Sequence, residues 1–135
     1  MPYVKFSEVE NAGEMPIIPA GLYTVVVDQI EERRTQSGDP LWRVGLRIQG
    51  GGRPELMGRR VFDNWVFSPK ALPRIKLIAS RFGLDVGLDR EITPRDFFGK
   101  EIEVEVKTRK TVGGDEREEN FVPYAGYRKG EEVPF

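Results

Sequence analysis

The order of hydrophobic periodicities along the chain constrains its fold more than any other feature. Three segments rich in β-branched and aromatic residues, separated by turn residues, are typical of strands: 21–32, 41–49 and 59–67. In the second segment every other residue is apolar, so that one face carries Trp42, Val44, Leu46 and Ile48. We read these four as core residues, with Arg43, Gly45 and Arg47 on the opposite face.

The period then changes to that of a helix. Ser68 and Pro69 are typical of a helix start and Gly83 of the residue just past its end, which predicts a helix over 69–82. Apolar residues recur at helical spacing within it, namely Ala71, Ile75, Ile78 and Phe82. After a short helical turn at 93–96, strand patterns return at 100–109 and 119–128.

Three strands, a helix and two further strands follow the order of an OB-fold, a small Greek-key barrel. We therefore predict a mainly β chain with a five-stranded OB-fold over 21–128 and one helix between its third and fourth strands. An N-terminal arm, 1–20, precedes this domain, and a short acidic tail, 129–135, follows it. An α+β sheet with a helix on one face has the same order of elements and stays open as an alternative.

Composition excludes several kinds of chemistry. The 135 residues contain no histidine and no cysteine, so disulfides, thiolate zinc sites and catalysis by a histidine base are excluded. We expect no cofactor and no enzymatic activity. No apolar run reaches the ~20 residues of a membrane span, and the N-terminus lacks a signal-peptide pattern, which predicts a cytoplasmic protein. Because the net charge is −1, any binding of phosphates requires a local basic face.

Short motifs along the chain resemble a family of phage and prophage proteins. The motifs are Gly21-Leu22-Tyr23, Gln36-Ser37-Gly38, the strand at 58–64 and the strand at 99–107, and the resemblance covers residues 16–128. Members of that family, long labelled as being of unknown function, are thought to be OB-fold single-stranded DNA-binding proteins of phage replication or recombination. The resemblance implies the same fold and a DNA-coating role in a bacterial or phage-infected cell.

The last residues of the chain resemble a second group of proteins, the bacterial single-stranded DNA-binding proteins, which end in an acidic tip. The similar residues here are Glu131, Glu132, Val133, Pro134 and Phe135. In such a tip the phenylalanine ring enters an apolar pocket of a partner while the carboxylates attract basic residues. The resemblance implies recruitment of replication or recombination proteins. The oligomeric state stays open.

Binding of single strands needs cations along a groove and aromatic faces on which bases stack. In OB-folds the usual platform is the outward face of strands two and three, flanked by the loops before strands two and five. The candidates that meet these needs are Arg43, Arg47, Arg59, Arg60, Phe62, Trp65, Lys107, Arg109, Lys110, Tyr124 and Arg128, with Phe121 and Tyr127 as further aromatics of the last strand. Gly45 would leave room for a base between Arg43 and Arg47.

Strand parity limits these candidates. Phe62 and Trp65 point to opposite faces of a regular strand, so that one of them faces the groove unless a bulge intervenes. The same holds for Tyr124 and Tyr127, of which one belongs to the core. Solvent-exposed arginines without a ligand role would produce the same pattern on the second strand. Three carboxylates at alternate positions, Glu101, Glu103 and Glu105, predict an outward face that repels DNA.

Two other functions compete with DNA coating. A barrel used for protein contacts alone, as a replication adaptor or host-factor inhibitor, would use the same tip and aromatics without affinity for DNA. A Mg²⁺-dependent nuclease would use a Pro-Asp … Glu-x-Lys pattern, loosely matched by Asp96, Glu105 and Lys107. That site needs its aspartate at a strand end, whereas Asp96 falls in the short helical turn.

Overall fold

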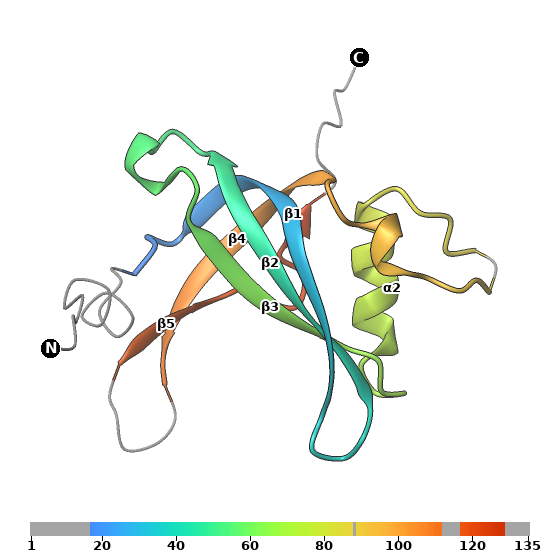
Figure 1. Cartoon of the computed structure of the whole chain (residues 1–135). Coiled ribbons are helices and arrows are strands. Elements are labelled where there is room, and N and C mark those ends of the chain that lie inside the picture. Colours follow the sequence, from blue (N-terminus) through green and yellow to red (C-terminus); the bar gives the residue numbers. More distant parts are fainter. Residues whose placement is uncertain (1–16, 88, 112–116, 129–135) are drawn as a thin grey trace, which may run out of the picture.

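A computed structural model describes residues 17–87, 89–111 and 117–128 of the chain. Its strands are β1 (Gly21–Arg34), β2 (Pro40–Gly50), β3 (Arg60–Val66), β4 (Glu101–Lys110), β5 (Glu118–Phe121) and β6 (Tyr127–Arg128), and its α-helix is α2 (Leu72–Arg81), as Figure 1 shows. Two 3₁₀ turns complete the elements, Pro54–Leu56 and Pro94–Asp96. The predicted tail and residues 1–16 of the predicted arm lie outside the described residues.

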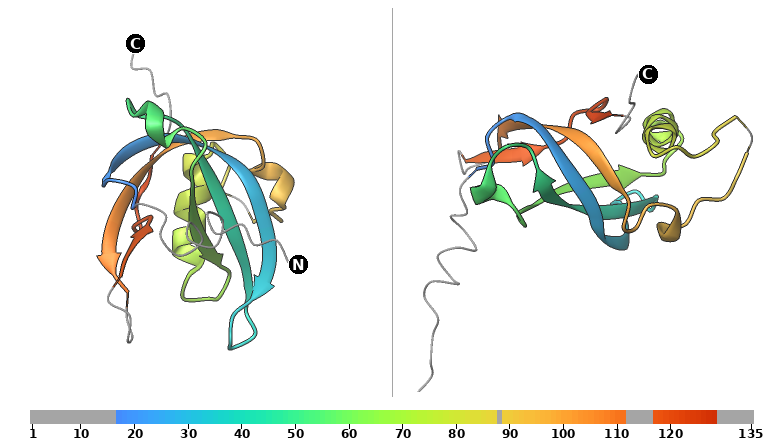
Figure 2. Two further views of the ribbon diagram at one scale, coloured as in Figure 1. Left: turned by 60° about the vertical axis from the view of Figure 1, so that its left-hand side comes forward. Right: turned by 90° about the horizontal axis from the view of Figure 1, so that it is seen from above.

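The strands form one antiparallel sheet. Its order is β3-β2-β1-β4-β5, and the two-residue β6 pairs with β4 as well. The prediction of a mainly β chain with one helix between the third and fourth strands is confirmed for the described residues. The sheet curves strongly, and α2 stands beside it (Figure 2). No ladder joins the end strands β3 and β5 in the described part, so the sheet is not closed by hydrogen bonding.

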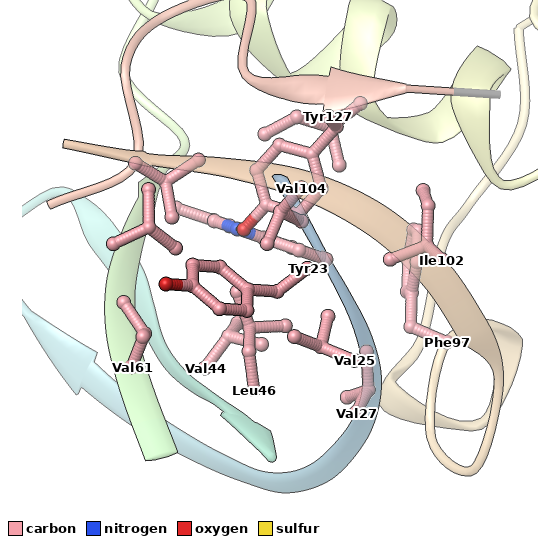
Figure 3. Close-up of a cluster of buried hydrophobic side chains, with 14 of the residues drawn as sticks. Tyr23, Val25, Val27, Val44, Leu46, Val61, Phe97, Ile102, Val104 and Tyr127 are labelled. Atoms are coloured by element: carbon pink, nitrogen blue, oxygen red, sulfur yellow. The ribbon is translucent and has the colours of Figure 1, made fainter. Parts of the chain in front are cut away.

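Apolar side chains of the curved sheet gather on its concave side (Figure 3). The alternating residues of β2 are buried as predicted, including Trp42 at 7% exposure. Tyr23 of β1 is buried among them, and its hydroxyl donates a hydrogen bond to the carbonyl of Pro19 at 2.6 Å. Aromatic rings close one end of this core: Trp42, Trp65, Phe67, Phe82, Phe97 and Tyr127.

Helix α2 begins at Leu72, three residues later than predicted. Pro73, which has no N–H, occupies its first turn, where the N–H groups lack partners in any helix. Residues 68–71 form a turn instead, in which the N–H of Ala71 donates to the carbonyl of Ser68 at 2.9 Å. The helix buries Ile75, Ile78 and Ala79 against the aromatic end of the core. It ends at Arg81, and Gly83 follows two residues later with a φ of 87°, which suits a residue without Cβ.

The predicted fifth strand, 119–128, is two short strands. Pro123 cannot donate to a ladder, and a turn follows it, closed by the N–H of Gly126 donating to the carbonyl of Pro123 at 2.9 Å. The chain then rejoins β4 as β6, opposite Glu103 and Val104. None of the described helices is long and apolar enough to span a membrane.

Candidate nucleic-acid groove

A groove lies between β3 and β5 at the two ends of the sheet. Its cavity measures about 510 Å³. The residues that line it come from β2, β3, the end of β4 and β5, and include Arg43, Arg60, Phe62, Asn64, Arg109, Glu119 and Phe121. Three cations and two phenylalanine rings from four strands therefore meet at one surface, which we call the groove below.

The first wall of the groove is built by β2 and β3. In the register of these strands Phe62 lies opposite Gly45, and Asn64 lies opposite Arg43. A Cβ on Gly45 would lie 3.2 Å from the Phe62 ring, so this ring covers the space above the glycine. The expectation that Gly45 leaves room for a base is therefore wrong. The guanidinium of Arg43 lies over the same ring, 4.2 Å from its centroid.

The second wall repeats this arrangement with β4 and β5. The guanidinium of Arg109 lies 4.5 Å from the centroid of the Phe121 ring. Glu119, two residues earlier on β5, approaches the Arg109 side chain at 3.5 Å. In each wall an arginine guanidinium thus lies over a phenylalanine ring, a pairing that cation–π attraction favours.

A bulge in β1 sets the charge at one end of the groove. The register between β1 and β2 shifts between Val27 and Gln29, and Asp28 sits at the shift. Its carboxylate lies 2.8 Å from Nη2 of Arg60 and 3.8 Å from Nε of Arg47. The hydrogen bond to Asp28 raises the pKa of Arg60. Arg47 and Arg60 face each other across the β2–β3 ladder, so one carboxylate holds two arginines.

The structure brings together four of the predicted DNA-binding residues, Arg43, Arg60, Phe62 and Arg109, in the lining of the groove. Arg47 lies next to Arg60 at its edge. Phe121, named as a strand-five aromatic, joins them, whereas Asn64 was missed because a lone asparagine carries no signal in a sequence. Lys110 is exposed at the end of β4. Arg59 precedes β3 and is half-buried.

Trp65 was expected to stack on bases, and this expectation is wrong. Its side chain is 0% exposed at the centre of the aromatic core. The indole Nε1–H donates to the hydroxyl of Tyr127 at 3.0 Å and lies 3.2 Å from Oδ2 of Asp63. The parity rule holds on β3, where Phe62 faces the groove and Trp65 the core. Of the other pair, Tyr127 is buried and Tyr124 is 58% exposed, as expected, but Tyr124 lies in the turn between β5 and β6 and strand parity is not the reason.

Two further candidates, Lys107 and Arg128, lie beside the acidic residues of β4 and do not line the groove. The Lys107 ammonium is 4.0 Å from the carboxylate of Glu105, and the Arg128 guanidinium is 3.7 Å from it. Glu101, Glu103 and Glu105 alternate with the buried Ile102, Val104 and Val106, as predicted. The cations here neutralise carboxylates of the same face, so we assign neither residue to the groove.

Behind the groove lies a buried ionic cluster that the sequence did not reveal. Asp63 of β3 accepts hydrogen bonds from the hydroxyl of Tyr127 at 2.7 Å and from Nη2 of Arg74 at 2.9 Å. The Asp63 and Arg74 side chains are only 10% and 15% exposed. Arginines of a surface helix are usually solvated, whereas Arg74 is held in this cluster by its ion pair. Burial, with the adjacent Asp63 charge, raises the pKa of Tyr127 well above its ordinary value.

The carboxylates of the nuclease pattern have other partners. Asp96 caps the 3₁₀ turn, accepting from the N–H of Thr93 at 2.8 Å, and lies 3.4 Å from the Arg90 guanidinium. Glu105 approaches Arg128 and Lys107 instead. Within the described ranges no three acidic residues gather in a geometry that would hold a metal ion.

The fold and the groove define a small mainly β protein with one helix and an arginine- and phenylalanine-lined surface groove. The chain belongs to a family described as a protein of unknown function (DUF669), whose model matches residues 3–129. No curated protein matches the chain. The family match spans the whole sheet, α2 and every residue of the groove, so the groove belongs to the part of the chain that the family shares.

Proposed function

We propose that this chain is a non-catalytic protein that binds single-stranded DNA along the groove, without sequence preference. We also propose that its sheet is of the OB type. The support is topological: β1 pairs with both β2 and β4, the helix follows β3, and the end strands β3 and β5 approach each other across the groove. In that fold, the β2–β3 face with its flanking loops is the usual platform for single strands.

The observation that carries the proposal is the pair of arginine–phenylalanine contacts on facing walls, Arg43 over Phe62 and Arg109 over Phe121. Every base has a π-face, so stacking on a phenylalanine ring tolerates any sequence and contributes about 1–3 kcal/mol per base. The guanidinium groups supply charge for the phosphates between the stacked bases.

The acidic residues near the groove are consistent with this role. Asp28 and Glu119 hold Arg60 and Arg109 at the groove surface, and phosphates would replace them as partners. A further set of carboxylates, Glu101, Glu103 and Glu105, lies on the part of β4 outside the groove lining and would keep phosphates away from that part of the strand. Separation of the two charges reconciles DNA binding with a net charge of −1.

We further propose that the protein coats DNA during replication or recombination, as in a phage-infected cell, and recruits partner proteins through residues Glu131–Phe135. Two carboxylates followed by Val-Pro-Phe combine long-range attraction to a basic partner with an aromatic anchor. These residues lie outside the described part of the chain, so this part of the proposal depends on their sequence alone.

Titration of labelled oligo-dT, followed by fluorescence anisotropy at two or more salt concentrations, tests the DNA-binding proposal. Duplex DNA of equal length is the control ligand. We expect salt-sensitive binding to the single strand and much weaker binding to the duplex. The variant with Arg43→Ala, Arg60→Ala and Arg109→Ala removes three groove cations and should lower the salt slope by about 2, since each contact with single-stranded DNA contributes about 0.7.

A matched control variant removes three charges from α2 and the turn before it. Lys70, Lys76 and Arg81 are all exposed there, and their replacement by alanine should leave the slope unchanged. If both triple variants lower the affinity equally, the groove has no special role and net charge alone governs binding. If the wild-type chain does not bind single strands at low salt, the proposal is refuted.

One observation favours a second function, that of a protein-interaction adaptor. An apolar cavity of about 810 Å³ lies beside α2, lined by residues that include Phe67, Leu72, Ile75, Val86 and Ile92. Leu72 is 49% exposed at its edge. Two results together would favour the adaptor over the DNA-coating protein. The wild-type chain would bind a replication protein but no DNA, and Leu72→Glu would abolish the binding of that protein.

A further inference from the structure

The two walls of the groove are not joined to each other directly by strand hydrogen bonds in the described part of the chain. β3 and β5 are the ends of the sheet, and within the described residues no ladder connects them. Simultaneous stacking on Phe62 and Phe121 is most favourable when the separation of the walls is set before binding, because no ordering cost is then added. The sheet connects the walls only by the path through β2, β1 and β4, so a side chain that contacts β3 and the chain around β5 directly would set this separation.

The side chain of Arg74, from α2, makes that link on the β3 side through a bidentate ion pair. Its Nη2 lies 2.9 Å from Oδ2 of Asp63, and its Nη1 lies 3.3 Å from Oδ1 of the same carboxylate. The Nη1 group also donates to the carbonyl of Asn64 at 3.4 Å. Asp63 and Asn64 directly follow Phe62 on β3, so these contacts fix the backbone beside the first ring.

The same guanidinium reaches the chain that follows β5. Nε donates to the carbonyl of Tyr124 at 3.2 Å, and Nη2 lies 3.4 Å from the carbonyls of Val122 and Pro123. These residues come directly after Phe121. With its side chain only 15% exposed, Arg74 is held between the two segments, and one planar group contacts both walls.

We infer that Arg74 is a positioning residue for DNA binding, which sets the separation of the two phenylalanine walls across the open edge of the sheet. This inference rests on the proposed function of the groove. An arginine suits the task because its planar fork presents five N–H donors in fixed directions, whereas a lysine concentrates its donors on one atom. Arg74→Lys therefore keeps the charge beside Asp63 but loses the carbonyl contacts on the β5 side.

A double-mutant cycle on oligo-dT affinity tests the inference. In the wild-type background Phe121→Ala should weaken binding by about 5- to 150-fold, which is the stacking contribution of one base. In the Arg74→Lys background the same replacement should weaken binding less than about threefold, because the second ring is already misplaced. Equal losses in the two backgrounds would overturn the inference, even if the protein binds DNA as proposed.

A second measurement is independent of DNA. The chain has no cysteine, so spin labels can be attached at Asn64→Cys on β3 and Glu118→Cys on β5, both exposed positions. The distance distribution between the labels, measured by pulsed electron paramagnetic resonance, should be narrow with Arg74 and clearly broader with Arg74→Lys. A control pair within the β1–β4 ladder and outside the groove, Leu22→Cys and Glu101→Cys, both exposed positions, should keep its width. An unchanged width across the groove would refute a positioning role, whereas failure of oligo-dT binding alone would refute the proposed function.

Discussion

Replacement of Asp63 by asparagine should destabilise the fold more than any other isosteric change near the groove. The carboxylate accepts hydrogen bonds from Tyr127, Trp65 and Arg74, which are contributed by β6, β3 and α2. Asparagine keeps the size of the side chain but turns one acceptor oxygen into an NH₂ donor. The Arg74 guanidinium then stays buried without its counter-charge.

The magnitude follows from the burial of the pair. Removal of one partner from a fully buried ion pair costs about 3–5 kcal/mol. The two side chains are 10% and 15% exposed, and this residual contact with water favours the lower end, about 3 kcal/mol. A domain of this size has a free energy of unfolding of roughly 5–15 kcal/mol, so Asp63→Asn removes a large part of it. The melting temperature should fall by about 10 °C.

Urea denaturation followed by tryptophan fluorescence measures this change, because Trp65 lies within the cluster. Asp28→Asn is the matched control: its partner Arg60 is half-exposed, so the urea midpoint should change far less. Equal shifts of the urea midpoint for the two variants would refute the reasoning. They would mean that the buried Asp63–Arg74 pair contributes no more to the free energy of unfolding than the exposed Asp28–Arg60 pair.

Three further outcomes are expected. Burial raises the pKa of Tyr127, so the stability linked to its protonated form is complete below the ordinary tyrosine pKa of about 10 and is lost as the pH rises above it. Urea midpoints at pH 9, 10 and 11 should fall less for Tyr127→Phe than for the wild type, and parallel falls would contradict this. Gly45→Ala places a Cβ 3.0 Å from Cβ of Gln29 and 3.2 Å from the Phe62 ring. It should therefore destabilise the fold by about 1–3 kcal/mol and weaken oligo-dT binding. An unchanged melting temperature and an unchanged affinity would contradict the close packing. Deletion of residues 131–135, which removes two acidic side chains, should leave oligo-dT affinity equal or higher in anisotropy titrations, because acidic residues compete with phosphates. A large loss would assign these residues to the DNA site.

The strands and the helix could be predicted because they depend on local patterns. The alternation that begins at Trp42 fixes which face of β2 is buried, and Gly83 marks the end of α2. The break in the last strand at Pro123 was missed, although proline in a strand interior is itself a signal. Pairing of β3 and β5 with the rest of the sheet depends on contacts between distant segments, which one sequence does not reveal.

Only the residues of the candidate site that lie on the outward face of the sheet could be predicted from the sequence. Arg43, Arg60 and Phe62 follow from strand parity once the platform is assumed. Arg74 was missed although its position gave a signal: it lies three residues after Ala71 and four before Ile78, beside the apolar stripe of α2. Asp63 carried the missed signal: it shares a strand face with buried Val61 and Trp65, and a carboxylate on an apolar face requires a buried cation.

The most direct test of the central claim is a map of backbone amide shifts during titration of the ¹⁵N-labelled chain with oligo-dT. Binding in the groove predicts that the largest shifts occur at Phe62, Asn64 and Phe121, on the two walls, while Glu103 and Glu105 on β4 stay unchanged. Shifts confined to β4, or scattered over the surface without saturation, would contradict a groove built to hold a single strand of DNA.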